Sequence, residues 1–183
     1  VALTLSGGAS FTVTGLRGDL DASSVGGALN VTTASVASGL SIVTRGPVSS
    51  NIDASALTAG QTLTLSSAGG NADFVTLNAG NLDATGSTRG LVVWAGPGAN
   101  VIQAGNGYNN LITGGGGSDV LMGGTDTDTF IFGSAGDLGA AASIAGGAGS
   151  DAIQVHDAAV LTDVLFAHAT SIERLELVDP GIV

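Results

Sequence analysis

The chain is 183 residues long, the size of one ordinary domain; with 31 glycines, 4% aromatic residues and no cysteine, it has neither a thick aromatic core nor a disulfide framework. Its 15 acidic and 4 basic residues give a net charge of −11, which excludes nucleic acid and anionic membranes because their phosphates need basic partners. No apolar run approaches the roughly 20 residues that span a bilayer, so we expect no membrane insertion. Because the chain starts at Val1 and its one methionine is Met122, we expect a processed product or a fragment.

Residues 1–93 repeat a short motif, which reads Leu-Asp-Ala-Ser from Leu20, Ile-Asp-Ala-Ser from Ile52 and Leu-Asp-Ala-Thr from Leu82. Short apolar runs and Gly, Ser and Asn turns follow each copy, so we expect several short strands per unit of about 30 residues. Such strands fit a sandwich or a solenoid, and the repeat favours the solenoid because stacked rungs bury a continuous core. We interpret the motif aspartate as the cap of a turn, with metal ligation as the alternative.

Residues 94–132 contain a tighter repeat. Four nonapeptides (95–103, 104–112, 114–122 and 123–131) and a detached copy at 146–154 follow the pattern Gly-Gly-x-Gly-x-Asp-x-U-x, in which U is apolar. Six residues predict a glycine-dependent turn and three a strand, so two copies form one coil of about 18 residues. Thr113 is an extra residue that breaks the register. We expect the U residues to fill a narrow core between two sheets: Ile102, Leu111, Leu121, Phe130 and Ile153.

The nonapeptide spacing also predicts Ca²⁺ between stacked turns. Ca²⁺ prefers carboxylate and carbonyl oxygens, and glycine allows turn carbonyls to point inward. The candidate ligands are the position-six residues Asp119, Asp128 and Asp151, the extra carboxylate Asp126, the asparagines Asn100 and Asn109 that replace aspartate in two copies, and the turn glycines Gly115, Gly117, Gly124, Gly147 and Gly149.

Two of these sites are expected to be weak. Pairing turns two motifs apart places Asn100 against Asp119 and Asn109 against Asp128, which leaves one carboxylate in each site. Fewer charges predict a dissociation constant at or above roughly 10⁻⁴–10⁻³ M. The alternative is a turn without an ion, in which asparagine bonds the backbone instead.

The nonapeptides resemble those of the RTX, or haemolysin-type, calcium-binding β-roll family. This resemblance implies export by type I secretion and folding in millimolar extracellular calcium. The motif repeats of residues 1–93, followed by nonapeptides and by the tail 166–177, are also similar to bacterial surface-layer (S-layer) proteins and large RTX adhesins. That similarity implies a helical turn with a terminal strand in 155–183. Between the fourth nonapeptide and the detached copy we expect a loosely repetitive insert at 133–145, so that 133–154 forms one region.

Catalytic interpretations have little support. The two histidines, His156 and His168, lie outside any His-Glu-x-x-His motif, and the chain has no Gly-x-Ser-x-Gly elbow. His156 beside Asp157 is a possible acid/base pair, but a plain turn is favoured because a third orienting partner is missing. Trp94 suggests either a carbohydrate platform or a core plug at the junction of the two repeats, and we favour the plug.

The sequence therefore predicts an all-β protein, a single right-handed parallel β-solenoid or RTX β-roll with short Gly-rich turns, that binds Ca²⁺ and is not an enzyme. We expect a structural protein of the bacterial cell surface, in an S-layer lattice or an adhesin, that self-associates into sheets or filaments. A surface polysaccharide is a further candidate partner. Two alternatives remain open: an RTX secretion and folding module of an exoenzyme, and a glycan-binding module.

Overall fold

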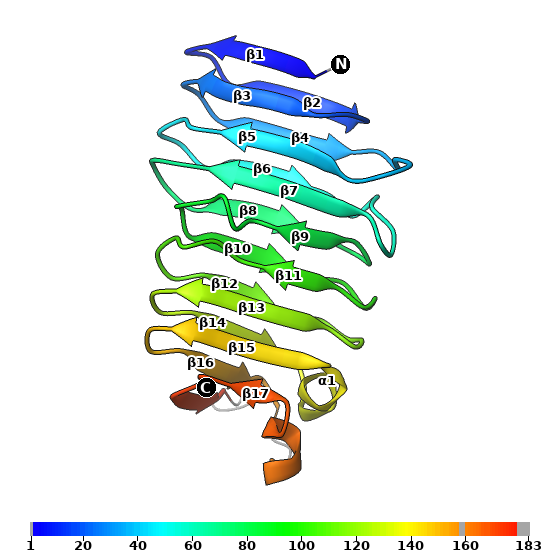
Figure 1. Cartoon of the computed structure of the whole chain (residues 1–183), viewed down its shortest axis with the longest axis vertical. Helices are drawn as coiled ribbons and strands as arrows, with labels where there is room; N and C mark the ends of the chain where they lie inside the picture. Colours follow the sequence, from blue (N-terminus) through cyan, green and yellow to red (C-terminus); the bar gives the residue numbers. More distant parts are fainter. Residues whose placement is uncertain (1, 158–159, 179–183) are drawn as a thin grey trace.

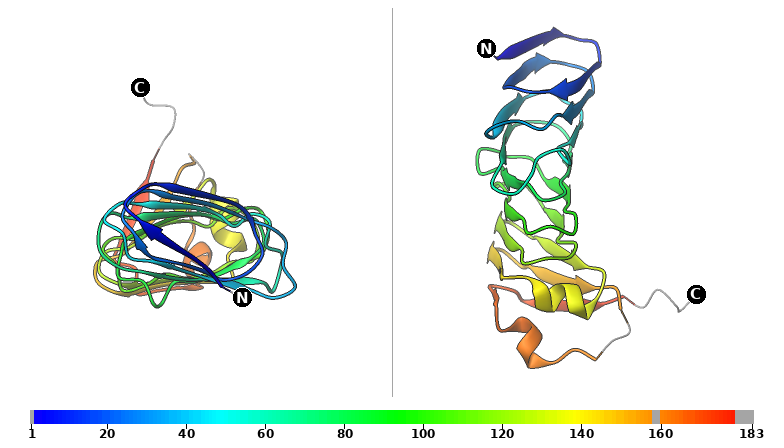
Figure 2. Two further views of the ribbon diagram at one scale, coloured as in Figure 1. Left: turned by 90° about the horizontal axis from the view of Figure 1, so that it is seen from above. Right: turned by 90° about the vertical axis from the view of Figure 1, so that its right-hand side faces the viewer.

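The short apolar runs form two parallel sheets in the computed structural model, which describes residues 2–157 and 160–178 (Figure 1). Successive strands alternate between the sheets, so each coil of the chain adds one strand to both of them. Seen along its axis the coil is a flattened oval, and the axis is the long dimension of the molecule (Figure 2). The predicted all-β parallel solenoid is confirmed.

Each sheet has nine strands in chain order. Sheet A consists of β1 (Leu3–Gly7), β3 (Leu20–Val25), β5 (Leu40–Thr44), β7 (Thr62–Ser67), β9 (Asn81–Asp83), β11 (Val101–Gln103), β13 (Val120–Thr125), β15 (Ser143–Ala148) and β17 (Ala169–Thr170). Sheet B consists of β2 (Phe11–Leu16), β4 (Leu29–Thr33), β6 (Ser50–Asp53), β8 (Asp73–Thr76), β10 (Leu91–Trp94), β12 (Leu111–Thr113), β14 (Thr129–Phe132), β16 (Ala152–Val155) and β18 (Arg174–Leu177).

The core lies between the sheets and is built from stacked rows of aliphatic side chains. Residues alternate inward and outward along each strand, as the burial of alternate positions in β4 shows. Because the strands are parallel and in register, the inward positions form continuous rows. In sheet A one row runs through Leu63, Leu82, Ile102, Leu121 and Ile144; in sheet B one runs through Val31, Ile52, Val75, Val93, Ile112, Phe130 and Ile153.

The structural repeat is shorter than the motif repeat of the first 93 residues. Leu63 pairs with Leu82 and Leu82 with Ile102, so one coil takes 19 or 20 residues there. The interval of about 30 residues between copies of the motif therefore contains three strands. Successive copies alternate between the sheets: the motif lies in sheet A at Leu20, in sheet B at Ile52 and in sheet A again at Leu82. No break separates the two repeat systems, since the expected boundary after residue 93 falls inside β10.

The C-terminal part departs from regular coils at two connections. Helix α1 (Ala135–Ala140) interrupts the turn after β14, but β15 resumes at Ser143, so the insert is shorter than the predicted 133–145. The 3-10 helix η1 (Asp163–Phe166) precedes β17 and β18, which agrees with the predicted helical turn and terminal strand. Among the described residues, neither helix has the length and hydropathy of a membrane-spanning segment.

The register of β12 corrects one predicted core position. Ile112, which is fully buried, pairs with Phe130 and points inward, whereas Leu111 is half-buried and points outward. The extra residue of this coil therefore lies in the turn before Asn110, and Thr113 belongs to the strand. The other four predicted core residues are fully buried: Ile102, Leu121, Phe130 and Ile153.

This register predicts unequal effects of two neighbouring substitutions. Ile112→Ala removes buried side-chain volume from the central row and is expected to lower the free energy of unfolding by about 2–4 kcal/mol. Leu111→Ala, the matched control, is expected to cost about 1 kcal/mol or less. Equilibrium unfolding in urea measures both, and a larger loss for Leu111→Ala would contradict the register.

Candidate metal centre

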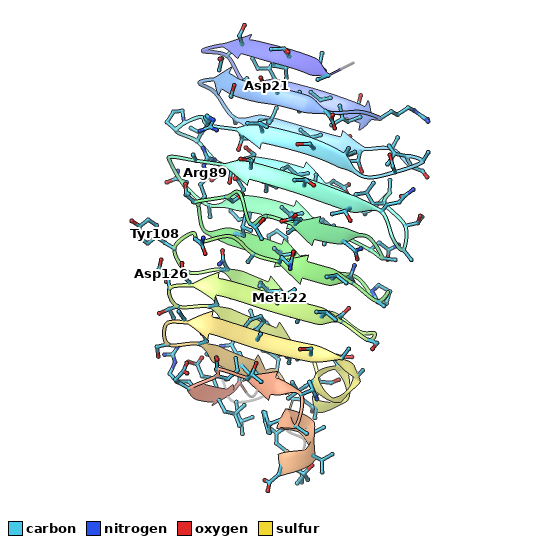
Figure 3. All side chains as sticks on the ribbon, in the orientation of Figure 1. Asp21, Arg89, Tyr108, Met122 and Asp126 are labelled. Atoms are coloured by element: carbon cyan, nitrogen blue, oxygen red, sulfur yellow. The ribbon has the colours of Figure 1, made fainter. Side chains whose placement is uncertain are left out.

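The turns form two stacks, one on each edge of the solenoid. We call the connections from sheet A to sheet B the A-to-B turns and those from sheet B to sheet A the B-to-A turns. Arg89, Tyr108 and Asp126 mark the edge that carries the A-to-B turns (Figure 3). At the last position of four successive A-to-B turns the chain places a side chain with a carboxyl or amide oxygen: Asn110, Asp128, Asp151 and Glu173. We call this set the carboxylate column.

The carboxylate column is joined by hydrogen bonds that run from rung to rung. The backbone N–H of Asn110 donates to Asp128 Oδ1 at 2.9 Å, and that of Asp128 donates to Asp151 Oδ1 at 2.8 Å. Asp151 N–H continues the ladder to Glu173 Oε2 at 2.7 Å. These bonds use one oxygen of each aspartate. The second oxygens, Oδ2 of Asp128 and Oδ2 of Asp151, are buried and have no hydrogen-bond partner within residues 2–157 and 160–178.

Those unpartnered oxygens lie over the first glycine of their own turns. A Cβ added at Gly123 would overlap both Asp128 Oδ2 and the carbonyl oxygen of Gly146. A Cβ added at Gly146 would overlap Asp151 Oδ2 and the carbonyl oxygen of Ser171 in the same way. Each glycine therefore opens a small cradle in which a carboxylate oxygen and a carbonyl oxygen of the next rung converge. Two such oxygens repel each other unless a positive charge lies between them.

A positive charge does lie among such oxygens higher in the same stack of turns. The Arg89 guanidinium is buried, and its Nη1 lies 2.9 Å from Asp73 Oδ1 and 3.0 Å from the Val48 carbonyl oxygen. Nη2 donates to the carbonyl oxygen of Ala68 at 3.0 Å and to that of Gly46. A side-chain cation is thus surrounded by turn carbonyls and one carboxylate, which are also the ligand types of a calcium site.

Between Arg89 and the Asp128 cradle, the side-chain amide of Asn110 donates hydrogen bonds to the turn oxygens in place of a cation. Asn110 Nδ2 donates to Asp128 Oδ1 at 2.8 Å and to the Gly123 carbonyl oxygen at 3.2 Å. Bonding of asparagine to the backbone, which we expected as an alternative at Asn100 and Asn109, is found at Asn100 and, in place of Asn109, at Asn110.

The B-to-A turns hold one further pair, which the sequence placed correctly. Asn100 N–H donates to Asp119 Oδ1 at 2.9 Å, and Asn100 Nδ2 donates to the Gly80 carbonyl oxygen at 2.6 Å. The next turn of this stack is replaced by α1, which Ser134 caps through its hydroxyl and which carries Asp137 in its first turn. The α1 helix therefore ends the run of nonapeptide turns on this edge.

Burial changes the acidity of the column. Desolvation raises the pKa of Asp128 to about 6, and Asp151 and Asp126 add to that rise, while bonds from Asn110 partly oppose it. Desolvation also raises the pKa of Asp119 to about 6, with a smaller contribution from Asp137. The pKa of Asp151 is raised by burial and by Glu173. Ionisation of these carboxyls at neutral pH therefore costs the folded state stability, and a bound cation would compensate that cost.

One predicted ligand position lies elsewhere. Asn109 is exposed and has a left-handed backbone with φ of 49°, and Asn110 takes the place opposite Asp128. This correction follows from the same register shift that moves Ile112 into the core. Asp126 is exposed and has φ of 69°, and its charge adds to the rise in the pKa of Asp128.

The predicted turn glycines have left-handed backbones that stack on the preceding rung. Gly147 pairs with Gly124, and a Cβ at Gly147 would overlap the Gly124 carbonyl oxygen, so only glycine fits. Positive φ is found at all five of the predicted positions: Gly115, Gly117, Gly124, Gly147 and Gly149.

The sequence interpretation missed four functional positions. Asn110 and Glu173 had a signal, because each directly precedes a short strand as Asp128 does, and aligning strands instead of glycines would have found them. Asp73 also opens a strand, but nothing in the sequence pairs it with Arg89, which belongs to the next rung.

The aspartates of the N-terminal motif act as turn caps. Asp53 Oδ1 accepts the Ser55 backbone N–H at 3.0 Å, and Asp83 Oδ1 accepts the Thr85 N–H at 3.1 Å. Asp21 Oδ1 accepts the Ser23 N–H at 2.9 Å, and hydrogen bonding from the Ser23 side chain and then from its backbone lowers the pKa of Asp21. The local bonds are those of an Asx turn, as predicted.

The structure also places Trp94 and His156, the two residues considered for carbohydrate binding and for acid/base chemistry. Trp94 is not a core plug: its ring is 43% exposed on the outer face of sheet B and stacks on Phe74. The His156 ring bonds Gln154 Oε1 at 2.9 Å.

The residues of the carboxylate column fit a hard cation such as Ca²⁺. Over residues 2–157 and 160–178 no three His, Cys, Asp or Glu side chains group around one metal position, so backbone carbonyls and water would supply the other ligands. The cradles at Gly123 and Gly146 offer such carbonyls beside an unpartnered carboxylate oxygen. Comparison with models of protein families, with curated proteins and with solved structures gives no match for this chain.

The raised pKa values predict how stability depends on pH in chelator. The folded protein holds the protons of Asp119 and Asp128 up to about pH 6, whereas the unfolded chain releases them near 3.8. Stability from these groups is therefore fully present below pH 3.8 and is lost as pH rises through about 6, and about 1–2 kcal/mol of this loss for each carboxyl falls between about pH 5 and about pH 7.5. Urea unfolding at about pH 5 and about pH 7.5 measures this, and Asp128→Asn should reduce the fall. A calcium-free protein that gains stability over that interval would contradict the burial of these charges.

Proposed function

We propose that this chain is a calcium-stabilised structural module of an extracellular bacterial surface protein, either an S-layer lattice or a large adhesin. The observation that carries the proposal is the pair of buried oxygens, Asp128 Oδ2 and Asp151 Oδ2, that have no hydrogen-bond partner among the described residues. Each lies beside a backbone carbonyl oxygen of the next rung, that of Gly146 for Asp128 and that of Ser171 for Asp151. Buried carboxylates are costly unless a cation or hydrogen bonds compensate them. Ca²⁺ between successive turns would compensate both and tie rung to rung.

Three further features support this proposal. The nonapeptide turns resemble those of RTX β-rolls, which bind calcium at the corresponding aspartates. Arg89 occupies a similar nest of oxygens higher in the stack, so the A-to-B turns are suited to a positive charge. With no cysteine, the chain also has no disulfide to stabilise it outside the cell, and bound calcium would fill that role.

A structural role also agrees with the shape. The two sheets form an elongated stack whose outermost strands are β1 and β2 at one end and β17 and β18 at the other (Figure 1). Leu3 and Leu175 continue the inward rows at these ends and are 44% and 47% exposed. Open ends of this kind allow further rungs to stack, and we propose that they are contact surfaces in a self-associated sheet or filament.

The calcium proposal predicts opposite behaviour of two aspartates. Millimolar Ca²⁺ is expected to raise the free energy of unfolding by about 1–3 kcal/mol. Asp128→Ala should lose most of this gain and lower calcium affinity, whereas Asp53→Ala should cost about 1 kcal/mol equally with and without Ca²⁺ because it removes a turn cap. Thermal unfolding by circular dichroism and isothermal titration with CaCl₂ measure these effects. An unchanged calcium response in Asp128→Ala, or its loss in Asp53→Ala, would contradict the assignment.

Self-association is expected to depend on Ca²⁺ and on the open ends. Chains of charge −11 repel one another, so divalent ions should promote contact. Light scattering and negative-stain microscopy should show ordered sheets or fibres in Ca²⁺ that disperse in chelator. Leu175→Asp should weaken assembly, whereas Val101→Asp, at a site 40% exposed on sheet A, should not. A protein that stays monomeric at high concentration in Ca²⁺ would favour the secretion-module alternative.

A further inference from the structure

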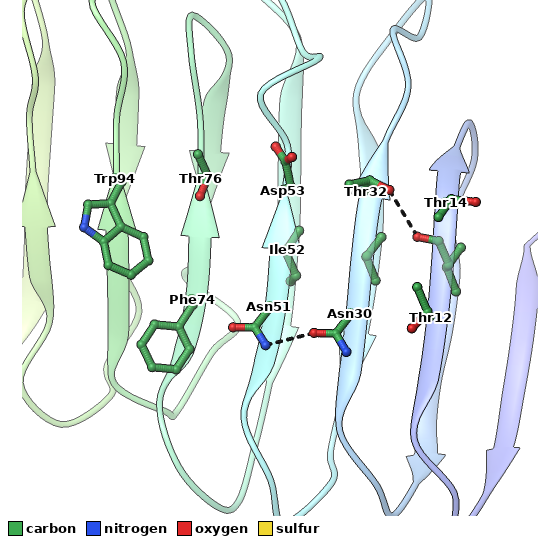
Figure 4. Close-up of a pocket in the computed structure, with 12 residues that line it drawn as sticks. Thr12, Thr14, Asn30, Thr32, Asn51, Ile52, Asp53, Phe74, Thr76 and Trp94 are labelled. Carbon is green, nitrogen blue, oxygen red and sulfur yellow. Dashed lines mark hydrogen bonds between the residues drawn. The ribbon is translucent and has the colours of Figure 1, made fainter.

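The outer face of sheet B carries a shallow groove of about 330 Å³ whose lining includes no residue of the carboxylate column (Figure 4). It extends along the solenoid axis across five neighbouring strands: β2, β4, β6, β8 and β10. The twelve lining residues come from these strands alone, so the groove is a property of the stacked sheet and is independent of the turns. Its outward-facing members form two rows that flank the buried central row.

An aromatic pair closes one end of the groove. The rings of Trp94 and Phe74 are stacked, with centroids 5.9 Å apart and planes 12° from parallel. Trp94 leaves 43% of its surface exposed, although an indole ring gains much from burial. Phe74 supports the ring from the neighbouring strand, so Trp94 is held as a rigid, flat and accessible platform.

Neutral hydrogen-bonding groups fill the rest of the groove. Asn51 Nδ2 donates to Asn30 Oδ1 at 2.9 Å, which orients both amides and leaves each with free donor and acceptor capacity at the surface. Exposed hydroxyls lie on the same strands, at Thr12, Thr32 and Thr76. Because neighbouring strands are about 4.8 Å apart, these groups repeat along the axis at about that interval.

The groove carries a single ionisable side chain, in contrast to the strongly acidic chain as a whole. Asp53 is its one ionisable residue, and Asp53 Oδ1 already accepts the hydroxyl and the N–H of Ser55. Without an arginine among its lining residues, the groove has no group to bind a sulfate, phosphate or uronate. An anionic ligand would also meet the field of a chain with net charge −11.

We propose that this groove binds a neutral oligosaccharide that lies along the solenoid axis. The apolar face of one pyranose ring stacks on Trp94, and the hydroxyls of the following units bond Asn51, Asn30 and the threonines. A repeat of about 4.8 Å between strands is close to the length of one hexose unit in an extended chain. Successive sugars therefore meet successive strands.

A peptide or a second copy of this chain fits the groove less well. An added peptide strand pairs with a sheet edge, and this groove lies on a sheet face. A protein interface needs a larger apolar centre, about 800 Å² on each partner, whereas the amides and hydroxyls here would be buried without fixed partners. Sugar hydroxyls supply both donors and acceptors to those groups.

The single tryptophan of the chain makes the test direct, because all indole fluorescence comes from Trp94. The full chain in millimolar Ca²⁺ is titrated with neutral hexasaccharides (cellohexaose, mannohexaose and chitohexaose), and with polygalacturonate as the anionic comparison. We expect a saturable change in emission with at least one neutral hexasaccharide and none with polygalacturonate. Calorimetry then gives the affinity of variants: Trp94→Ala should weaken binding roughly tenfold or more, Asn51→Ala less, and Trp94→Phe less than Trp94→Ala.

Tyr108→Ala is the matched control, since Tyr108 is the other strongly exposed ring (76%) and lies in a turn outside the groove. Circular dichroism confirms that each variant is folded in the same buffer, so failure of the glycan site is separable from failure of the calcium proposal. The proposal is overturned by no binding of any neutral hexasaccharide, by binding of polygalacturonate alone, or by affinity that Trp94→Ala retains and Tyr108→Ala loses.

Discussion

In the A-to-B turns, a carboxyl oxygen of one rung accepts the backbone N–H of the rung before it, and this bond recurs from Asn110 to Glu173. The bond sets the register between turns, and turn register in turn aligns the inward rows of both sheets. It also draws aspartate carboxylates into an environment where ionisation is unfavourable, as the raised pKa of Asp128 shows. The hydrogen bonds that align the turns therefore also bury carboxylates, and a nearby positive charge would stabilise their ionised form.

The turn oxygens have three chemically different environments along the length of the stack. Near Asp73 a guanidinium from Arg89 lies among the turn oxygens. In the following coils the amide of Asn110, which is neutral, donates hydrogen bonds from Nδ2 to Asp128 Oδ1 and to the Gly123 carbonyl oxygen. Among the described residues, Oδ2 of Asp73, of Asp128 and of Asp151 each has no donor. Asp73 already has the Arg89 cation on its other oxygen, so we propose calcium at Asp128 and Asp151. We therefore propose that the stability of the N-terminal half depends little on ions, whereas calcium orders the C-terminal half.

Much of this organisation was predictable from the sequence, and the errors share a cause. Period-two alternation and the recurring glycines predicted the solenoid, its parallel sheets and the pairing of Asn100 with Asp119. Counting a fixed nine residues from the glycines misplaced Asn109 and Leu111, because turns accept an extra residue more easily than strands do. Partners such as Arg89 and Asp73 lie 16 residues apart and meet only through coil length, which no local pattern encodes. Trp94 was misplaced because an apolar run does not show which of its residues point outward.

The central claim is that a cation lies between successive A-to-B turns, and its position can be observed directly. Crystals grown in CaCl₂, with diffraction recorded at a wavelength where calcium scatters anomalously, would show each ion as a peak in an anomalous difference map. We predict a peak within bonding distance of Asp128 Oδ2 and the Gly146 carbonyl oxygen, and a second beside Asp151 Oδ2. Peaks confined to the turn-capping aspartates Asp21, Asp53 and Asp83, or no peak along the carboxylate column, would contradict the account.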